Sequence, residues 1–204
     1  FESHDYNIVL KGRQIGISTL VAGYALWLML FHNDKNILVI ATKQETAKNL
    51  VTKVRFMHQN LPVWLRGEIV TDNKLSLQFT NGSQIKAVAS SKDAGRSEAL
   101  SLLILDEAAF IDDAEIIWTA ESSTLSTGGQ AILLSTPNGV GNWFHKTYVD
   151  SESGQNNFKP TKLPWHLHPE RDQTWREIEG AKQGNPKKAA QEFDCDFLAT
   201  GDNV

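Results

Sequence analysis

Apolar positions along the chain form two alternating patterns, short continuous runs and longer segments with helical spacing. The segment 17–31 has the length and apolar content of a largely buried helix, 44–58 has the spacing of an amphipathic helix, and 112–122 is also predicted to be a helix. Buried strands are predicted by four short apolar runs, at 6–10, 36–42, 100–108 and 129–139. This alternation of strands and helices predicts an α/β fold with a largely parallel sheet.

Two stretches depart from that alternation. The runs "GEIV", "KLSLQF" and "SQIKAVA" are short, alternate in polarity and are separated by "TDN" and "TNG", which predicts an antiparallel meander with hairpin turns. After the polar stretch "DSESGQNN", the pattern predicts one more strand at 158–163 and two helices around 173–183 and 186–193.

Composition and charge narrow the class of protein. A chain of 204 residues with 41% hydrophobic and 22% charged residues suits one globular domain with a small appendage. The net charge of −4 argues against a broad basic surface, so any DNA contact would be local or lie on parts absent from this chain. The longest apolar run, around 20–31, is shorter than the roughly 20 residues of a membrane span, and no signal-peptide pattern is visible. The single cysteine, Cys195, excludes an internal disulfide, fits a reducing compartment and is expected to be buried.

The segment "KGRQIGIST" lies between the first predicted strand and the first predicted helix, where a phosphate-binding loop is expected. Aligned with G-x-x-x-x-G-K-[ST], it places Gly16 on the second glycine, Ile17 on the lysine, Ser18 on the hydroxyl and Lys11 on the first glycine. Because lysine binds phosphate as a flexible point charge, an ammonium at the front of the loop is chemically feasible. Two interpretations stay open, a phosphate loop whose lysine has moved to the front and a glycine-rich turn that binds no nucleotide.

The run "LLILDEA" delivers Asp106 and Glu107 directly after a buried strand, at the sheet edge where ligand sites of α/β proteins lie. Asp106 is a candidate ligand of Mg²⁺ together with the Ser18 hydroxyl, and Glu107 is a candidate to orient and polarise an attacking water. In the alternative interpretation the two acids cap the following helix, although Asp112 and Asp113 are better placed for capping.

These segments, in this order, resemble the ATPase domain of the large terminase subunit of tailed bacteriophages, the motor that packages double-stranded DNA into preformed capsids. "GRQIGIST" is similar to the family's R-Q-x-G-K-[ST] loop, "NGSQIKAVASSKDAGRS" to its hairpin and arginine segment, and "LLILDEAAFI" to its acidic strand. "LLSTPNG" is similar to its coupling motif and "QEFDCDFLATGD" to the end of the domain. Some terminases carry a deviant loop with lysine at its front, and "KGRQIGIS" fits that form.

The resemblance implies a P-loop NTPase fold of the ASCE/RecA-like class that uses ATP and Mg²⁺. Arg13 matches an arginine proposed to sense the γ-phosphate, with a surface salt bridge as the alternative. Arg96 is implied as an arginine finger, acting on its own or on a neighbouring subunit's nucleotide, with an ordinary loop arginine as the alternative. Ser135 and Thr136 are implied as coupling residues, with strand-end capping as the alternative. The nucleotide-binding loop implied by the resemblance consists of Lys11, Gly12, Arg13, Gln14, Ile15, Gly16, Ile17, Ser18 and Thr19.

The resemblance also divides the chain into a P-loop ATPase core at 1–152 and a lid-like subdomain at 153–204. The small core of that subdomain is expected to contain four aromatic residues, Trp165, Trp175, Phe193 and Phe197. The nuclease domain of full terminases is expected to be absent from this chain, so DNA cleavage is not predicted.

The partners implied are double-stranded DNA, the portal protein and the small terminase subunit. A homo-oligomeric ring on the procapsid is implied as well, in the host cell cytoplasm, with a monomer as the state in isolation. Two other functions stay open. A superfamily 2 helicase-like ATPase would need a second RecA-like domain, and a catalytically degenerate nucleotide-binding scaffold would explain Ile17 but not the pair formed by Asp106 and Glu107.

Overall fold

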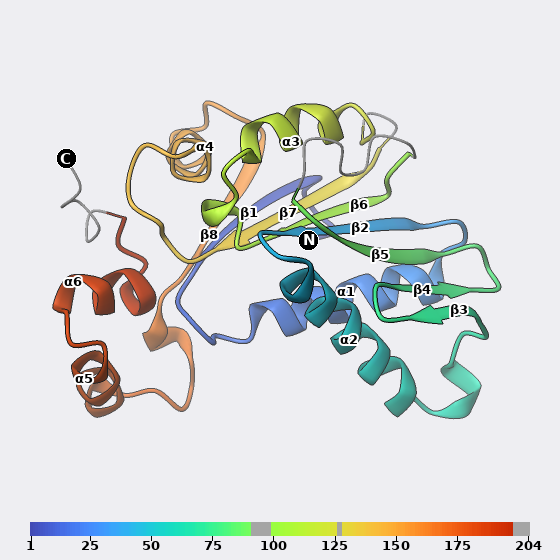
Figure 1. Ribbon diagram of the computed structural model, residues 1–204, viewed down its shortest axis with the longest axis horizontal. Helices are drawn as coiled ribbons and strands as arrows, with labels where there is room; N and C mark the ends of the chain where they lie inside the picture. Colours follow the sequence, from blue (N-terminus) through green and yellow to red (C-terminus); the bar gives the residue numbers. More distant parts are fainter. Residues whose placement is uncertain (91–98, 126–127, 198–204) are drawn as a thin grey trace.

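The computed structural model describes residues 1–90, 99–125 and 128–197. At its centre lies one eight-stranded sheet with the strand order β3-β4-β5-β2-β6-β7-β1-β8 (Figure 1). The strands span Tyr6–Lys11 (β1), Asn36–Ala41 (β2), Ile69–Asn73 (β3), Ser76–Phe79 (β4), Gln84–Ala89 (β5), Leu102–Asp106 (β6), Gln130–Ser135 (β7) and Phe158–Leu163 (β8).

Every pairing from β5 to β8 is parallel, whereas β3 and β4, and β4 and β5, pair antiparallel. The predicted fold class, a mostly parallel sheet flanked by helices, is confirmed. The predicted meander is confirmed as well, and it extends the parallel sheet beyond β5.

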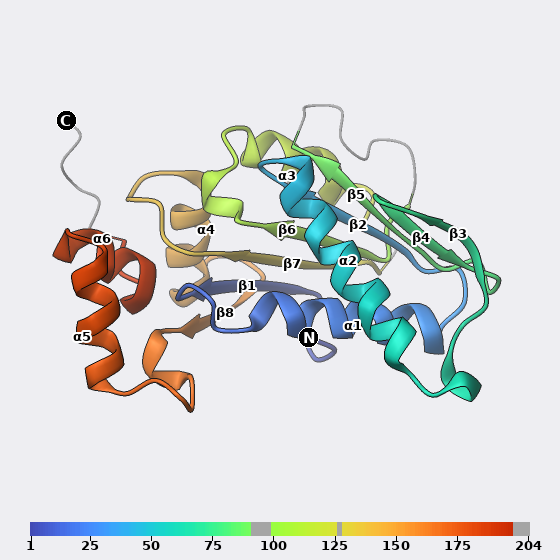
Figure 2. The ribbon, with the colours of Figure 1, turned by 60° about the horizontal axis from the view of Figure 1, so that its bottom comes forward.

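Helices cover both faces of the sheet (Figure 2). On one face lie α1 (Ile17–Phe31) and α2 (Gln44–Asn60), and on the other lie α3 (Ala114–Ser122) and α4 (Trp143–Glu152). Successive strand residues point to opposite faces, so Val9 joins the core of α1 and α2 while Ile8 and Leu10 join the other core. This two-sided burial explains why the central strands are apolar at nearly every position.

Helix α4 is not among the helices that the sequence pattern predicts. Its amino terminus is capped by Asn142, whose Oδ1 accepts a 2.9 Å hydrogen bond from the His145 N–H. Phe144 and Tyr148, four residues apart, are its buried contacts with the sheet. The short apolar stripe and the polar "HKT" and "DSE" around it explain why the pattern is weak.

The C-terminal part contains α5 (Gln173–Lys182), α6 (Pro186–Ala189) and a π-helical turn at Ala190–Asp194. The predicted helix at 186–193 is therefore two elements. Three short 3₁₀ turns complete the described elements, η1 (Val63–Leu65), η2 (Ala108–Phe110) and η3 (Trp165–Leu167). In the described part of the chain, no helix combines the length and the apolar character needed to cross a membrane.

The aromatic residues predicted to form one small C-terminal core belong to two clusters. Trp175, on α5, lies 6.2 Å from Trp165 and 5.3 Å from Phe193 between ring centroids. Phe197 instead packs against Phe144 and Tyr148 of α4, so that part of the prediction is wrong. Strand β8 also pairs with β1 in the central sheet, although it lies beyond the predicted boundary at 152–153. A lid-like behaviour of 153–204 stays a prediction.

Candidate nucleotide-binding site

Three neighbouring parallel strands bring the loop lysine, the acids and the predicted coupling serine to one edge of the sheet. β1 ends at Lys11, β6 ends at Asp106, and β7, which lies between them, ends at Ser135. The register pairs Leu10 with Ser135 and Asp106 with Leu134. This carboxyl edge is where α/β sheets bind ligands.

Lys11 and Glu107 form an ion pair at this edge. Nζ of Lys11 lies 2.8 Å from Oε1 of Glu107, and the two side chains are 7% and 32% exposed. The Ser135 hydroxyl makes a longer contact of 3.5 Å with Oε2 of Glu107. An ammonium removed this far from water needs a charged partner, and Glu107 supplies it. The lysine at the front of the loop therefore contacts the acid that was predicted to polarise water.

Asp106 lies beside this pair and is itself buried. Burial is the main cause that raises the pKa of the Asp106 carboxyl to about 6, an effect that the Lys11 ammonium opposes and the Glu107 carboxylate reinforces. Its Oδ1 accepts a 3.0 Å hydrogen bond from the Glu107 N–H. A divalent cation would relieve the cost of a buried negative charge, so this carboxyl is suited to bind one.

The turn that follows β6 is tied to the end of β7. Glu107 has a left-handed backbone with φ of 55°, which is uncommon for a residue with a side chain. The Ser135 hydroxyl accepts a 3.1 Å hydrogen bond from the Ala109 N–H, and Asn138 Nδ2 donates to the Ala109 carbonyl at 3.0 Å. Neither Glu107 nor Asp113, the residues that precede η2 and α3, caps its helix with its side chain, so the capping interpretation of the acids gains no support.

The loop between β1 and α1 has the backbone of a tight turn. Gly16 adopts φ of 90° and Gln14 adopts φ of 56°, both in the left-handed region. No described side chain caps the amino terminus of α1, and its first turn carries no acidic residue. The N–H groups that a helix leaves unbonded at this end, together with the positive end of its dipole, favour an anion.

The residue at the usual lysine position points away from such an anion. Ile17 is 9% exposed and belongs to the core between α1 and the sheet. Ser18 is half-buried and Thr19 is exposed in the same first turn. The loop therefore places an apolar side chain in the core where the usual pattern has its lysine.

The C-terminal segment lies against the back of the loop. The N–H of Gly12 donates to the carbonyl of Leu163 at 2.8 Å, and the N–H of Arg13 donates to the carbonyl of Glu192 at 2.7 Å. The Arg13 side chain also donates from Nε to Oε2 of Glu192 at 2.7 Å. A Cβ at Gly12 would lie 2.8 Å from the Phe193 carbonyl, so only glycine fits there. Glu192 was missed by sequence reasoning, because no local pattern links it to a loop so distant in sequence.

A comparison with known protein families shows the family of this chain. The family described as "Terminase large subunit, T4likevirus-type, N-terminal" matches residues 8–204, nearly the whole length. The chain belongs to this terminase family. The sequence-based resemblance to the large terminase subunit is thereby confirmed.

Solved structures have the same fold. The large terminase ATPase domain of Thermus phage P74-26 superposes with a TM-score of 0.74 at 23% identity, over 96% of this chain and 90% of that one. The large terminase of a thermophilic bacteriophage, solved in complex with ADP, gives 0.76 at 14% identity over 97% and 49%. The HK97 bacteriophage large terminase gives 0.74 at 17% identity over 96% and 46%. The terminase chain thus spans about half the length of the last two proteins.

Three further residues of this terminase chain were predicted to belong to the site, Thr136, Arg13 and Arg96. Thr136 is 3% exposed next to Ser135. Arg13 engages Glu192, so its proposed role at the γ-phosphate stays a prediction. Arg96 lies outside the described residues.

Mg²⁺ fits the donor atoms at the carboxyl edge of this terminase sheet. Among the described residues, no group of three or more His, Cys, Asp or Glu side chains could hold a metal. Mg²⁺ needs fewer protein ligands, because it is usually bound by one or two carboxylates plus substrate phosphates and water. The Asp106 carboxylate and the Ser18 hydroxyl are oxygen donors of the hard type that it prefers.

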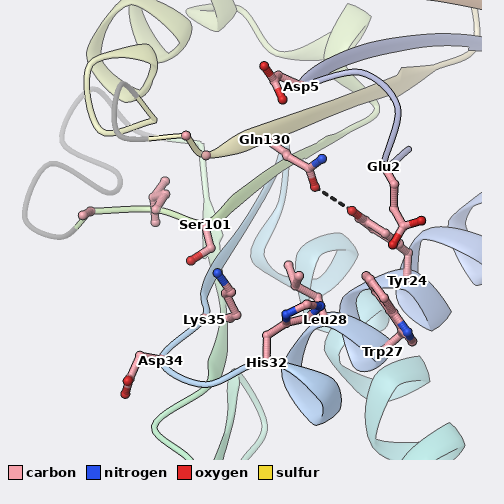
Figure 3. Close-up of a pocket in the computed structure, with 14 residues that line it drawn as sticks. Glu2, Asp5, Tyr24, Trp27, Leu28, His32, Asp34, Lys35, Ser101 and Gln130 are labelled. Carbon is pink, nitrogen blue, oxygen red and sulfur yellow. Dashed lines mark hydrogen bonds between the residues drawn. The ribbon is translucent and has the colours of Figure 1, made fainter.

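A hollow of about 410 Å³ lies at the opposite edge of the terminase sheet (Figure 3). Lys35 and Ser101 precede β2 and β6, and Gln130 begins β7, so this hollow faces the amino ends of the strands. On its α1 side, the Tyr24 hydroxyl donates to Oε1 of Gln130 at 2.6 Å. Since ligand sites of parallel sheets lie at the carboxyl ends, the candidate nucleotide site is elsewhere.

Proposed function

We propose that this chain is the ATPase of a viral DNA-packaging motor, which hydrolyses ATP with Mg²⁺ to move double-stranded DNA into a procapsid. The observation that carries the proposal is the ion pair between Nζ of the buried Lys11 and Oε1 of the partly exposed Glu107. It joins the front of the phosphate loop to the acidic strand end in one site. Holding the Lys11 ammonium at 7% exposure has a cost that a purely structural role does not require.

Each residue has a defined part in the proposed reaction. The first-turn N–H groups of α1 bind phosphate oxygens, and Lys11 adds the positive charge that Ile17 does not provide. Asp106 and the Ser18 hydroxyl would hold Mg²⁺, which when bound offsets charge on the transferred phosphoryl group. Glu107 orients the attacking water and accepts its proton. Phosphate oxygens would compete with Glu107 for the Lys11 ammonium. The Glu107 carboxylate would then be free to accept the proton of the attacking water.

Ser135 and Thr136 are proposed to couple hydrolysis to movement. The Ser135 hydroxyl touches both the Ala109 N–H and Glu107, so a change at the carboxylate alters the contacts of the turn after β6 and of β7 together. Thr136 follows directly and is buried. A rearrangement at the nucleotide would thereby reach two strand ends at once.

Nucleotide binding by relatives supports the choice of ATP. The large terminase of the thermophilic bacteriophage has been solved in complex with ADP and with ATP-gamma-S. For this chain we propose the same class of ligand, with DNA, the portal protein and the small terminase subunit as partners. The proposed working state is a homo-oligomeric ring on the procapsid in the host cell cytoplasm.

Two alternatives are less favoured. Membership of the terminase large-subunit family does not favour a superfamily 2 helicase-like fragment. A degenerate scaffold module explains Ile17, but it gives no reason for the buried Lys11 beside Glu107 and Asp106.

The test is Glu107→Gln. The amide keeps the size of the side chain but cannot accept the proton of water, so hydrolysis should fall about 10²-fold or more. ATP binding should persist, because the loop and Asp106 are unchanged. Phosphate release with Mg²⁺, with and without double-stranded DNA, measures hydrolysis, and calorimetry with ATP measures affinity.

Glu115→Gln, which removes the same charge from an exposed position on α3, is the matched control and should leave both quantities unchanged. Turnover by Glu107→Gln at the rate of the unmodified chain would remove Glu107 from the site. ATP binding without hydrolysis by the unmodified chain would favour the degenerate scaffold. Failure of the unmodified chain to bind ATP at all would favour a glycine-rich turn that binds no nucleotide.

A further inference from the structure

Arg171 contacts the phosphate loop from the outside. Its Nη1 donates to the carbonyl of Arg13 at 2.9 Å and its Nη2 donates to the carbonyl of Gln14 at 2.7 Å. The same guanidinium lies over the ring of Trp175, with Cζ 4.2 Å from the centroid. One planar group therefore bridges two successive loop carbonyls and stacks on α5.

The loop needs such a partner for a geometric reason. Backbone N–H groups that bind phosphate have to converge on it, and the carbonyls of the same peptides then point outward. An outward carbonyl still requires a hydrogen-bond donor or water. The left-handed backbone of Gln14 is an unfavourable conformation for a residue with a side chain, so its persistence depends on contacts around it.

Arg171 is itself held in place. Asp172, the next residue, caps α5 by accepting a 2.7 Å hydrogen bond from the Trp175 N–H. The ring of Trp175 then packs on Phe193, whose carbonyl faces Gly12. The fork of donors is thus oriented by the same C-terminal segment that binds the Gly12 and Arg13 N–H groups through Leu163 and Glu192.

We propose that Arg171 is a positioning residue that fixes the phosphate loop in its nucleotide-binding shape. It acts through the carbonyls of Arg13 and Gln14, without contact to the nucleotide. The inference rests on the proposed function, because it assumes that the loop N–H groups bind nucleotide phosphates. It also predicts that the loop is ordered before the nucleotide arrives, which lowers the entropy cost of binding.

The experiment compares Arg171→Ala, Arg171→Lys and the control Lys182→Ala, which removes one exposed positive charge from α5. Hydrogen–deuterium exchange of residues 11–20 without nucleotide reports the loop, because the Gly12 and Arg13 N–H groups are hydrogen-bonded in the ordered shape. Calorimetry with ADP reports affinity. Arg171→Ala should exchange faster in this segment and bind ADP about tenfold more weakly, the effect of losing one net hydrogen bond to a charged group.

Arg171→Lys should have a loop exchange rate and an ADP affinity between those of the unmodified chain and of Arg171→Ala. The reason is that an ammonium keeps the charge but cannot donate a planar pair of hydrogen bonds to two carbonyls. Circular dichroism establishes that each variant is folded, and the lysine variant keeps the test available should the alanine variant unfold. Lys182→Ala should match the unmodified chain in both measurements.

The two proposals fail in distinguishable ways. Unchanged loop exchange in both Arg171 variants would overturn the positioning role, whatever their affinity, and weaker binding with unchanged exchange would point to direct nucleotide contact. Faster exchange with unchanged ADP affinity would also overturn it, since the loop shape would then not matter for binding. No ADP or ATP binding by the unmodified chain would instead contradict the proposed function.

Discussion

At the scale of single residues, Ile17 stands where a phosphate loop usually has its lysine, and Lys11 stands where it has its first glycine. Ile17 packs into the core, whereas Lys11 lies at the end of β1 and reaches Glu107. The lysine position of the usual pattern opens a helix, so its side chain has to turn back over the loop to reach phosphate. A lysine at the strand end is already directed at the same carboxyl edge, which makes the moved position feasible.

Lys11→Ala and Ile17→Lys separate the two interpretations of the loop. If Lys11 supplies the phosphate-binding charge, Lys11→Ala should weaken nucleotide binding and nearly abolish turnover, because the cation acts in both the ground state and the transition state. Ile17→Lys should bring no gain in nucleotide affinity or turnover. It should lower the melting temperature, because it puts an ammonium at a position where Ile17 is only 9% exposed. Nucleotide affinity, phosphate release and thermal unfolding measure these effects.

Lys159→Ala, on the exposed side of β8, controls for the change of net charge. The moved-lysine interpretation is wrong if Lys11→Ala binds and hydrolyses ATP as well as the unmodified chain does. A gain of nucleotide binding in Ile17→Lys would favour the other interpretation, in which the glycine-rich turn of the unmodified chain binds no nucleotide.

Three of the residues that sequence reasoning found share one property, a position at the end of a strand. Lys11, Asp106 and Ser135 end parallel strands, so a rule about sheet edges is enough to bring them together. Arg171 and Glu192 lie in a C-terminal segment of turns and short helices, where no periodicity or strand rule assigns a spatial neighbour. Their contacts with the loop depend on how that segment folds back, which a local pattern does not encode.

At the scale of elements, the strands and the long helices followed from apolar periodicity because each buries a wide apolar surface. Helix α1 begins and ends where the pattern predicts it, at Ile17 and Phe31. Short elements with few buried residues were harder to predict. Helix α4 buries only Phe144, Tyr148 and Ser151, and α6 changes to a π-helical turn after Ala189. The place of β8 in the central sheet also required the tertiary structure, since its sequence predicts a strand but not the partner of that strand.

Cys195 reports whether the C-terminal segment stays docked on β1. Its thiol is 1% exposed and donates to the Leu10 carbonyl at 3.8 Å, and burial raises the pKa of the thiol to about 12. Because the thiolate is the reactive form, the native thiol should react with an aromatic disulfide reagent about a hundredfold or more slowly than the unfolded chain at about pH 8. As the pH rises towards that pKa, reaction should accelerate if the segment stays folded.

Arg176→Ala is the matching variant for this measurement. Arg176 pairs with Asp194, with 2.6 Å between Nη2 and Oδ2, directly before Cys195. Loss of the pair should loosen the segment and increase the labelling rate, while Lys182→Ala should leave the rate unchanged. Rapid labelling of the unmodified chain would show that the segment does not stay on β1.

At the scale of the whole molecule, the chain has its C-terminal helices at one end and the β3–β4 hairpin at the other, with the candidate site at the carboxyl edge between them (Figure 1). With a net charge of −4, the chain as a whole is not suited to coat DNA, so DNA-dependent activity is expected to need a local contact or an assembly. Charge and composition alone indicated this much, but neither identifies the residues of such a contact.

A catalytic arginine supplied by a neighbour would make the assembly the active unit. Arg96, which lies outside the described residues, is proposed for this role from its position in the polar segment before the acidic strand. Dilute chains should then hydrolyse ATP slowly and gain specific activity with concentration or on assembly. Mixing Arg96→Ala chains with Glu107→Gln chains should restore part of the activity, because some sites combine an intact Glu107 with a neighbour's intact Arg96.

The control mixes Arg96→Ala chains with chains that carry both Arg96→Ala and Glu107→Gln, where no subunit supplies the arginine. That mixture should stay inactive at the same total concentration, which separates complementation from simple crowding. The readout is phosphate release with Mg²⁺ and double-stranded DNA, and analytical ultracentrifugation establishes that mixed assemblies form. Equal activity in the two mixtures, once mixed assemblies are present, would contradict an arginine acting between subunits. Full activity of Arg96→Ala chains alone would remove Arg96 from catalysis altogether, because neither its own site nor a neighbour's would then depend on that charge.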